Sequence, residues 1–138
     1  MIFELSKASK PHIEAIAADF DLTPMQAWTL KLLVADEPST MSELASALSC
    51  DASNVTAIVD RLESRGFVER RAAGHDRRVK VLRVTESGKV AHARLAARME
   101  QAPPAIANLS LADQRLLRDV LRRAVETLAP VEAVEASR

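Results

Sequence analysis

The stretch from Asp51 to Gly66 constrains the fold of this chain more than any other. Its apolar residues recur at positions i, i+3, i+4 and i+7, which is typical of a helix with one buried stripe. These residues are Val55, Ile58, Val59 and Leu62. Asp51 is a residue type that favours the start of a helix, and Gly66 is one that favours its end. The stretch therefore predicts a helix that packs one side against a core and leaves the other side free.

A short helix is predicted before this one, because Thr40 and Glu43 have the spacing of a capping box. Its inward positions are Leu44, Ala45 and Leu48. A few residues around Cys50 join the two helices. The outward face of the second helix carries small or polar side chains, namely Ser53, Asn54, Thr56, Ala57, Asp60 and Arg61. Two helices joined by a short turn, the second with small polar residues outward, match the helix-turn-helix pattern of DNA-binding proteins.

A hairpin is predicted after Gly66, where the apolar period changes to about two. Residues 67–72 and 79–84 contain β-branched residues, with Gly74 and Asp76 in the connection, which indicates two antiparallel strands. The cationic residues of this hairpin are Arg70, Arg71, Arg77, Arg78, Lys80 and Arg83. A basic hairpin after a helix-turn-helix is a DNA-binding wing. The alternative is a solvated edge hairpin, because charged residues also protect exposed strands from pairing.

The formal net charge is zero, but charge is distributed unevenly along the chain. Residues 1–60 carry 3 basic and 9 acidic side chains, whereas residues 61–83 carry 8 basic and 3 acidic ones. Of the 19 basic residues 14 are arginine, whose planar guanidinium suits bidentate contact with phosphate or a guanine edge. A local basic patch is a stronger sign of nucleic-acid binding than overall charge. Residues 61–83 therefore predict contact with nucleic acid.

Two helices are predicted before the helix-turn-helix. The first spans Ser9–Asp19 and the second spans Pro24–Ala35, opened by a capping box of Thr23 and Gln26. The apolar face of the first holds Ile13, Ile16, Ala17 and Phe20. The apolar face of the second is expected to hold Met25, Trp28, Leu32 and Leu33.

Two more helices are predicted after the hairpin. Thr85 caps a long helix that runs toward Pro103, and Ser110 with Asp113 caps the last one. The apolar stripe of the last helix consists of Leu117, Leu121, Val125 and Leu128, with Leu116 and Val120 beside it. The first and last helices carry more apolar surface than the periphery of a small domain requires, so we expect a partner to cover them.

Composition excludes several classes of protein. The 138 residues fit one domain, without an apolar run of about 18 residues or a signal peptide, so we expect a cytoplasmic protein with no membrane partner. One cysteine and three scattered histidines predict neither a disulfide nor a metal site, and we expect Cys50 to pack in the turn rather than act as a redox switch. With 3 glycines, no phosphate-binding loop and no nucleophile paired with a base, the chain is expected to have no enzymatic activity and no cofactor.

Three stretches in combination resemble the MarR family of bacterial transcriptional regulators. They are "LTPMQAWTL" at the start of the second helix, "SNVTAIVDRLESRGFVERR" leading into the hairpin, and "DRRVKVLRVTESG" returning from it. The resemblance covers Leu22 to about Leu95 closely and the flanking helices loosely. It implies a mainly α fold with a small β-hairpin wing, in a single domain over residues 1–138. Within that domain, residues 22–100 would form the winged helix-turn-helix lobe and connecting helix, and residues 1–21 and 101–138 the dimerisation helices.

The resemblance also implies a homodimer that binds double-stranded DNA, most often as a repressor on an inverted-repeat operator. Its recognition helix enters the major groove, and its wing places an arginine in or beside the minor groove. The groove-facing positions here are Ser53, Asn54, Thr56 and Ala57, with Arg61 nearer the DNA backbone. In the wing, Asp76 would orient Arg78. Phosphate attraction is expected from Arg70, Arg71, Arg77 and Lys80.

Many family members bind a small molecule between the dimer helices and the DNA-binding lobe. His12 and Trp28 are the candidates here for contact with a small aromatic effector, and the alternative is a surface histidine with a core tryptophan. A second function remains open, in which the chain is a dimeric protein-interaction module of the same fold that lacks operator binding. The arginines that favour the DNA-binding regulator are Arg70, Arg71, Arg77 and Arg78.

Overall fold

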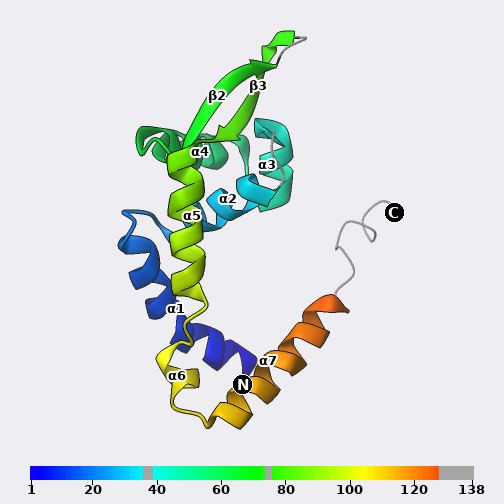
Figure 1. Cartoon of the computed structure of the whole chain (residues 1–138). Helices are drawn as coiled ribbons and strands as arrows, with labels where there is room; N and C mark the ends of the chain where they lie inside the picture. The colour runs from blue at the N-terminus through cyan, green and yellow to red at the C-terminus, as the bar shows by residue number, and fades with distance from the viewer. Residues whose placement is uncertain (36–38, 74–75, 128–138) are drawn as a thin grey trace, which may run out of the picture. The chain divides into compact units, whose positions relative to one another are not determined.

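The computed structural model describes residues 1–35, 39–73 and 76–127, and for residues 2, 39 and 76–79 it describes the backbone alone. These residues form two compact units. The larger unit is residues 2–101, and the smaller unit begins at Ala102 and includes Met1. The larger unit combines helices with a small antiparallel sheet, and the described residues of the smaller unit are helical apart from its turns (Figure 1).

Helix α1 spans Ile2–Ala18, so the predicted start at Ser9 was wrong. The helix continues through Pro11, which has no backbone N–H to donate but does not end the helix. The Ser9 hydroxyl donates to the carbonyl oxygen of Leu5 at 2.8 Å, which adds a bond in the turn before the proline. After α1 the chain turns at Asp21, which adopts a left-handed conformation with φ 55°.

Helix α2 spans Pro24–Ala35, as predicted. The capping box is confirmed, because the Thr23 hydroxyl accepts from the N–H of Gln26 at 3.2 Å and the Gln26 side chain accepts from the N–H of Thr23 at 2.9 Å. The predicted inward face was wrong for Met25 and Trp28, which are 46% and 49% exposed, and is confirmed for Leu33, which is buried. The buried residues are Ala27, Thr29, Leu30 and Leu33. Apolar residues surround α2, and α1, α4, α5 and β3 all pack against it, so periodicity alone does not select its buried face.

Helices α3 (Met41–Leu48) and α4 (Ala52–Ser64) form the predicted helix-turn-helix. The capping box of Thr40 and Glu43 opens α3, and hydrogen bonds from the backbone and side chain of Thr40 hold the pKa of Glu43 below its ordinary value. Beyond the end of α4, Gly66 has φ 71°, and its N–H donates to the carbonyl oxygen of Glu63 at 2.8 Å. The glycine therefore ends the helix as the sequence predicts.

The predicted hairpin is confirmed by strands β2 (Val68–Ala73) and β3 (Asp76–Val84), which pair antiparallel with Val68 opposite Val84. A third strand, β1 (Ser39–Thr40), pairs with the other edge of β3, giving the order β1-β3-β2. Strand β1 was not predicted, because two residues are too few to display a period. Residues 74–75 of the predicted connection lie outside the described residues, and Asp76, predicted to lie in the connection, begins β3 instead. Both long strands extend away from α3 and α4 (Figure 1).

Helix α5 (Glu86–Met99) starts at the base of the hairpin. The Thr85 hydroxyl accepts from the N–H of Gly88 at 3.0 Å, which confirms the predicted cap. Gly88 lies so close to β2 that a Cβ atom built on it would be 2.1 Å from the carbonyl oxygen of Phe67. Only glycine permits this approach, which sets the start of α5 directly against the hairpin.

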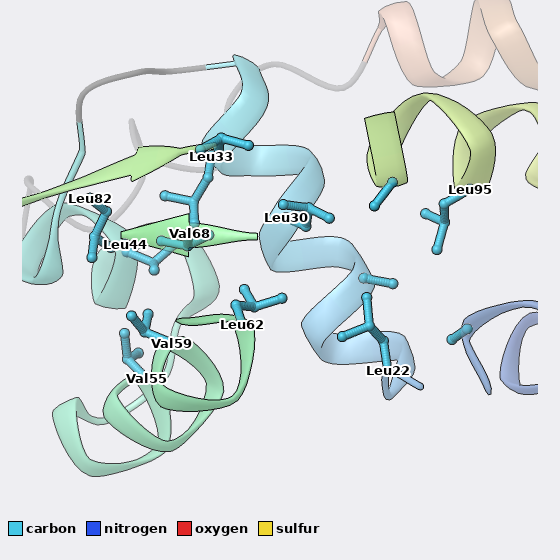
Figure 2. Close-up of a cluster of buried hydrophobic side chains, with 14 residues drawn as sticks. Leu22, Leu30, Leu33, Leu44, Val55, Val59, Leu62, Val68, Leu82 and Leu95 are labelled. Atoms are coloured by element: carbon cyan, nitrogen blue, oxygen red, sulfur yellow. The ribbon is translucent and has the colours of Figure 1, made fainter. Parts of the chain in front are cut away.

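The core of the larger unit gathers side chains from the helices and the sheet (Figure 2). The predicted stripe of α4 is confirmed, because Val55, Val59 and Leu62 are fully buried and Ile58 is partly buried against them. Residues from the other elements that complete the core include Leu22, Leu30, Leu33, Leu44, Val68, Leu82 and Leu95. Burial of one side of α4 in this core leaves its opposite side at the surface of the larger unit.

The smaller unit contains helices α6 (Pro104–Ala107) and α7 (Leu111–Glu126). Helix α6 was not predicted, because four residues barely exceed one helical turn. The cap of α7 is confirmed, since the Ser110 hydroxyl accepts from the N–H of Asp113 at 3.1 Å. No described residue of α7 is fully buried, and Leu128, predicted to extend its stripe, lies outside the described residues. Among the described helices, none is both long and apolar enough to cross a membrane.

Candidate nucleic-acid interface

The turn between α3 and α4 contains one residue with an unusual backbone conformation. Ser49 adopts a left-handed conformation with φ 48°, and the N–H of Cys50 donates to the carbonyl oxygen of Ala45 at 3.1 Å. Cys50 is partly buried and packs against the core. Asp51 occupies the N-cap position of α4 as predicted, but its side chain makes no capping hydrogen bond. The turn thus orients α4 through backbone bonds and packing.

The outward face of α4 is a row of exposed side chains. Its members are Ser53, Asn54, Thr56 and Ala57. The Thr56 hydroxyl donates to the carbonyl oxygen of Ala52 at 2.8 Å, so its oxygen keeps only acceptor capacity toward another molecule. The Asn54 amide nitrogen lies 3.5 Å from Asp51 Oδ1, a long contact that leaves most of its bonding capacity free. The side chains of this face are small. The amide of Asn54 offers both donors and an acceptor for a hydrogen bond to another molecule.

Arg61, at the C-terminal half of α4, is engaged within the protein. Its guanidinium lies 2.7 Å from Asp21 Oδ2, and that of Arg65 lies 3.1 Å from the same oxygen. Arg65 also donates to the carbonyl oxygen of Phe20 at 3.4 Å. The left-handed turn after α1 therefore binds one arginine of α4, Arg61, and the arginine that follows the helix, Arg65. The sequence did not suggest Asp21 as their partner, because Asp21 precedes Arg61 by 40 positions.

Among the cationic side chains of the hairpin that the structure describes, that of Arg70 on β2 is the most enclosed. Its guanidinium lies 2.5 Å from Asp60 Oδ1 and also contacts Glu63 Oε2, so two carboxylates of α4 bind one arginine of the wing. The Arg70 side chain is 24% exposed. Burial alone would lower its pKa, but the hydrogen bond to Asp60 and the charges of Glu63 and Asp60 outweigh burial and raise the pKa above its ordinary value. Arg70 stays protonated and bound to these acids.

The other predicted wing residues are more open or lie outside the described side chains. Arg71 is exposed and pairs with Glu69 on the same strand at 2.7 Å. Lys80 on β3 is exposed. The side chains of Asp76, Arg77 and Arg78 lie outside the described part, although their backbone belongs to β3. The predicted contact of Asp76 with Arg78 therefore stays a prediction.

The two residues predicted to line an effector pocket lie on different helices. His12, on α1, has a buried Nε2 atom without a hydrogen-bond partner in the described part of the chain. Trp28, on α2, is half exposed, with the Lys31 ammonium 4.8 Å from the centre of its ring. No hydrogen bond joins His12 to Trp28 within the residues that the structure describes. A pocket between them stays a prediction.

Sequence comparison identifies related proteins. Residues 20–79 match the sequence model of the MarR family. The transcriptional repressor MprA of Escherichia coli is 49% identical over 47 residues, which are 34% of this chain and 27% of MprA. The uncharacterized HTH-type transcriptional regulator YdgJ of Bacillus subtilis is 31% identical over 105 residues, which are 75% of this chain and 64% of YdgJ. The matched parts span less than two thirds of either relative.

Solved structures show the same fold. A serine-for-cysteine variant of MarR from E. coli is similar with a TM-score of 0.79 at 23% identity, covering 90% of this chain and 93% of that chain. Its complex with operator DNA is similar with a TM-score of 0.69 at 23% identity, covering 89% of each chain. These likenesses confirm the mainly helical fold with a small β-hairpin wing. Over residues 20–79 the chain matches the MarR family, and the relatives to which it is similar are named as transcriptional regulators or repressors.

Proposed function

We propose that the chain is a homodimeric, sequence-specific DNA-binding transcriptional repressor. The observation that carries this proposal is the placement of the outward face of α4, with Asn54 exposed, beside a hairpin rich in arginine and lysine. Small side chains admit a helix into the major groove, and the hairpin adds charge that attracts phosphate. The similarity to MarR in complex with operator DNA supports the same role here.

In this proposal α4 enters the major groove. Ser53, Thr56 and Ala57 allow close approach, and the Asn54 amide makes paired contacts with an adenine edge. The hairpin lies along the adjacent backbone, where Arg78, oriented by Asp76, reaches in or beside the minor groove. The remaining residues proposed to face DNA phosphates are Arg61, Arg71, Arg77 and Lys80.

A second copy of the chain completes the proposed DNA-binding unit. Helix α7 leaves apolar side chains exposed, including Leu116, Leu121 and Val125, and a second copy that covers them would form a two-fold symmetric pair. The two α4 helices would then lie about one DNA turn apart, roughly 34 Å, on an inverted repeat with half-sites about 10 base pairs apart.

Release by a small aromatic molecule is the proposed control of this repressor. His12 supplies a buried ring nitrogen free to bond, and Trp28 an exposed indole. Because the chain has one tryptophan, its fluorescence reports directly on a ligand that binds there. Phenolic and benzoate-type compounds should quench it and weaken DNA binding at the same concentrations, and quenching without loss of DNA binding would contradict this form of control.

The DNA-binding proposal is tested by fluorescence anisotropy with DNA from beside the protein's own gene and a scrambled duplex. Footprinting on that DNA first identifies the site that the wild type protects. Asn54→Ala should weaken binding to this site by about 1–3 kcal/mol per half-site and change binding to the scrambled duplex much less. Asn108→Ala, the same change at the C-cap of α6, is the matched control and should change neither. Equal losses on both duplexes would mean that Asn54 reads no base.

The alternative is a dimeric protein-interaction module of the same fold that lacks operator binding. It predicts no footprint and no difference between the two duplexes, although the dimer would remain. A footprint that covers an inverted repeat excludes this alternative, whereas a dimer without any footprint excludes the repressor.

A further inference from the structure

The ion pairs of Arg70 connect helix α4 to the hairpin of β2 and β3, the two elements proposed to contact DNA. Asp60 and Glu63 lie three positions apart on α4 and so project from one side of that helix. The two terminal nitrogens of Arg70 on β2 each contact one of these carboxylates. The backbone N–H of Arg70 also donates to Glu63 Oε1 at 3.3 Å, so both the side chain and the main chain of this residue are bound to α4.

Arg70 stands where the hairpin leaves the core. Val68, two positions earlier on β2, is buried, whereas Arg71 and Ala72 are exposed. A link at this position limits how far the hairpin can swing about its buried base. The planar guanidinium fork suits this task, because it binds two acceptors in one fixed geometry, which a lysine ammonium does not.

The charge balance around Arg70 opposes a role in attracting DNA. One positive charge faces the two negative charges of Asp60 and Glu63, so the local sum is negative. A phosphate that approached Arg70 would have to displace a carboxylate. Arg71 and Lys80, with exposed side chains, lack this enclosure.

We propose that Arg70 is a positioning residue that fixes the wing relative to the recognition helix, and that it makes no phosphate contact of its own. This inference rests on the proposed DNA-binding function. It gives Arg70 a different role from the phosphate attraction expected from the sequence. It also means that Asp60 and Glu63, although negatively charged, favour DNA binding, because they hold Arg70 and thereby the wing in place.

Salt dependence distinguishes positioning from phosphate contact. Binding of each variant to the site that the wild type protects is measured by anisotropy between about 50 and 200 mM salt. Arg70→Gln should weaken binding about tenfold, a typical coupling energy of about 1.4 kcal/mol, while the slope of log affinity against log salt stays that of the wild type. Lys80→Gln, the matched loss of one charge, should make the slope shallower by up to about 1.8 in a dimer.

Two further variants change DNA affinity differently if Arg70 positions the wing than if it contacts phosphate. Arg70→Lys keeps the charge but loses the fork, so it should weaken binding nearly as much as Arg70→Gln. Glu63→Gln removes a negative charge, yet it should weaken binding, and the double variant with Arg70→Gln should be no weaker than Arg70→Gln alone. A shallower slope for Arg70→Gln, wild-type binding by Arg70→Lys, or tighter binding by Glu63→Gln would overturn the proposal.

Hydrogen exchange in the DNA-free protein tests the link independently of DNA. Backbone amides of β2 and β3 should exchange faster in Arg70→Gln, Arg70→Lys and Glu63→Gln than in the wild type, and at the wild-type rate in Lys80→Gln. Amides of α2 should keep their protection, which shows that the fold is intact. If the hairpin amides exchange at the wild-type rate in all three variants, the proposed link between Arg70 and α4 is overturned. A wild-type protein that binds no DNA would overturn the proposed function, and the exchange rates alone would then test the link.

Discussion

Helices α4 and α7 each carry an apolar stripe at helical spacing in the sequence but differ in how the chain covers that stripe. In α4 the residues Val55, Val59 and Leu62 are each 0% exposed. In α7 the residues Leu116 and Val125 are 63% and 64% exposed. An apolar stripe at helical spacing therefore predicts an amphipathic helix and its apolar side, but does not say what covers that side.

The elements around each helix explain the difference. Helices α2 and α3 and strand β2 pack against α4 within the larger unit. Helix α7 belongs to the smaller unit, where its described residues are exposed or half-buried. An exposed apolar face on a water-soluble helix is costly unless a partner covers it, and the proposed second copy of the chain would supply that cover.

The largest expected effect is loss of the proposed dimer when the apolar face of α7 is made acidic. Leu121→Asp together with Val125→Asp should weaken dimerisation by at least about 4 kcal/mol, roughly a thousandfold, because unpaired carboxylates would enter the interface from both copies. Sedimentation over a range of protein concentrations measures this change. Arg115→Ala with Arg122→Ala, which changes the net charge equally on the charged side of α7, should leave a dimer. A double aspartate variant that remains dimeric would show that α7 is not the interface.

Truncation of one leucine on each helix gives the next largest effect. Leu62→Ala should lower the free energy of unfolding by about 2–5 kcal/mol, because it leaves a cavity in the filled core. Leu121→Ala should change the stability of the monomer little, since its side chain is 43% exposed within the chain, and should weaken the dimer instead. Urea unfolding measures the first quantity and sedimentation the second. Equal unfolding losses at high dilution would mean that α7 is covered by its own chain.

Local signals in the sequence predicted most of the fold. The capping residues Thr23, Thr40, Thr85 and Ser110 each accept the expected backbone hydrogen bond, because capping depends on residues only three positions apart. Short elements were missed, since β1 and α6 have too few residues to show a period. The buried face of α2 was predicted only in part, because its apolar residues surround the helix and several elements pack against it.

Contacts in the candidate site were harder to predict than the site itself. The exposed row on α4 follows from the buried stripe on the opposite side, so Asn54 could be placed from the sequence. The ion pairs of Asp21 with Arg61 and of Arg70 with Glu63 depend on how the turn after α1 and strand β2 pack against α4. A count of charges along the chain does not contain this packing, and therefore it does not show which cations have a carboxylate partner within the protein.

The smallest expected effect concerns the N-cap residues of the same two helices. The Ser110 hydroxyl accepts the N–H of Asp113 at the start of α7, whereas the Asp51 side chain makes no capping hydrogen bond at the start of α4. Ser110→Ala should therefore cost about 1 kcal/mol of stability. Asp51→Ala should change stability by less than about 0.5 kcal/mol, because packing of the buried stripe and not the cap holds α4 in place. Urea unfolding of the two variants at one protein concentration checks the order. A larger loss for Asp51→Ala would mean that the carboxylate stabilises α4 through its charge at the positive end of the helix, without a direct hydrogen bond.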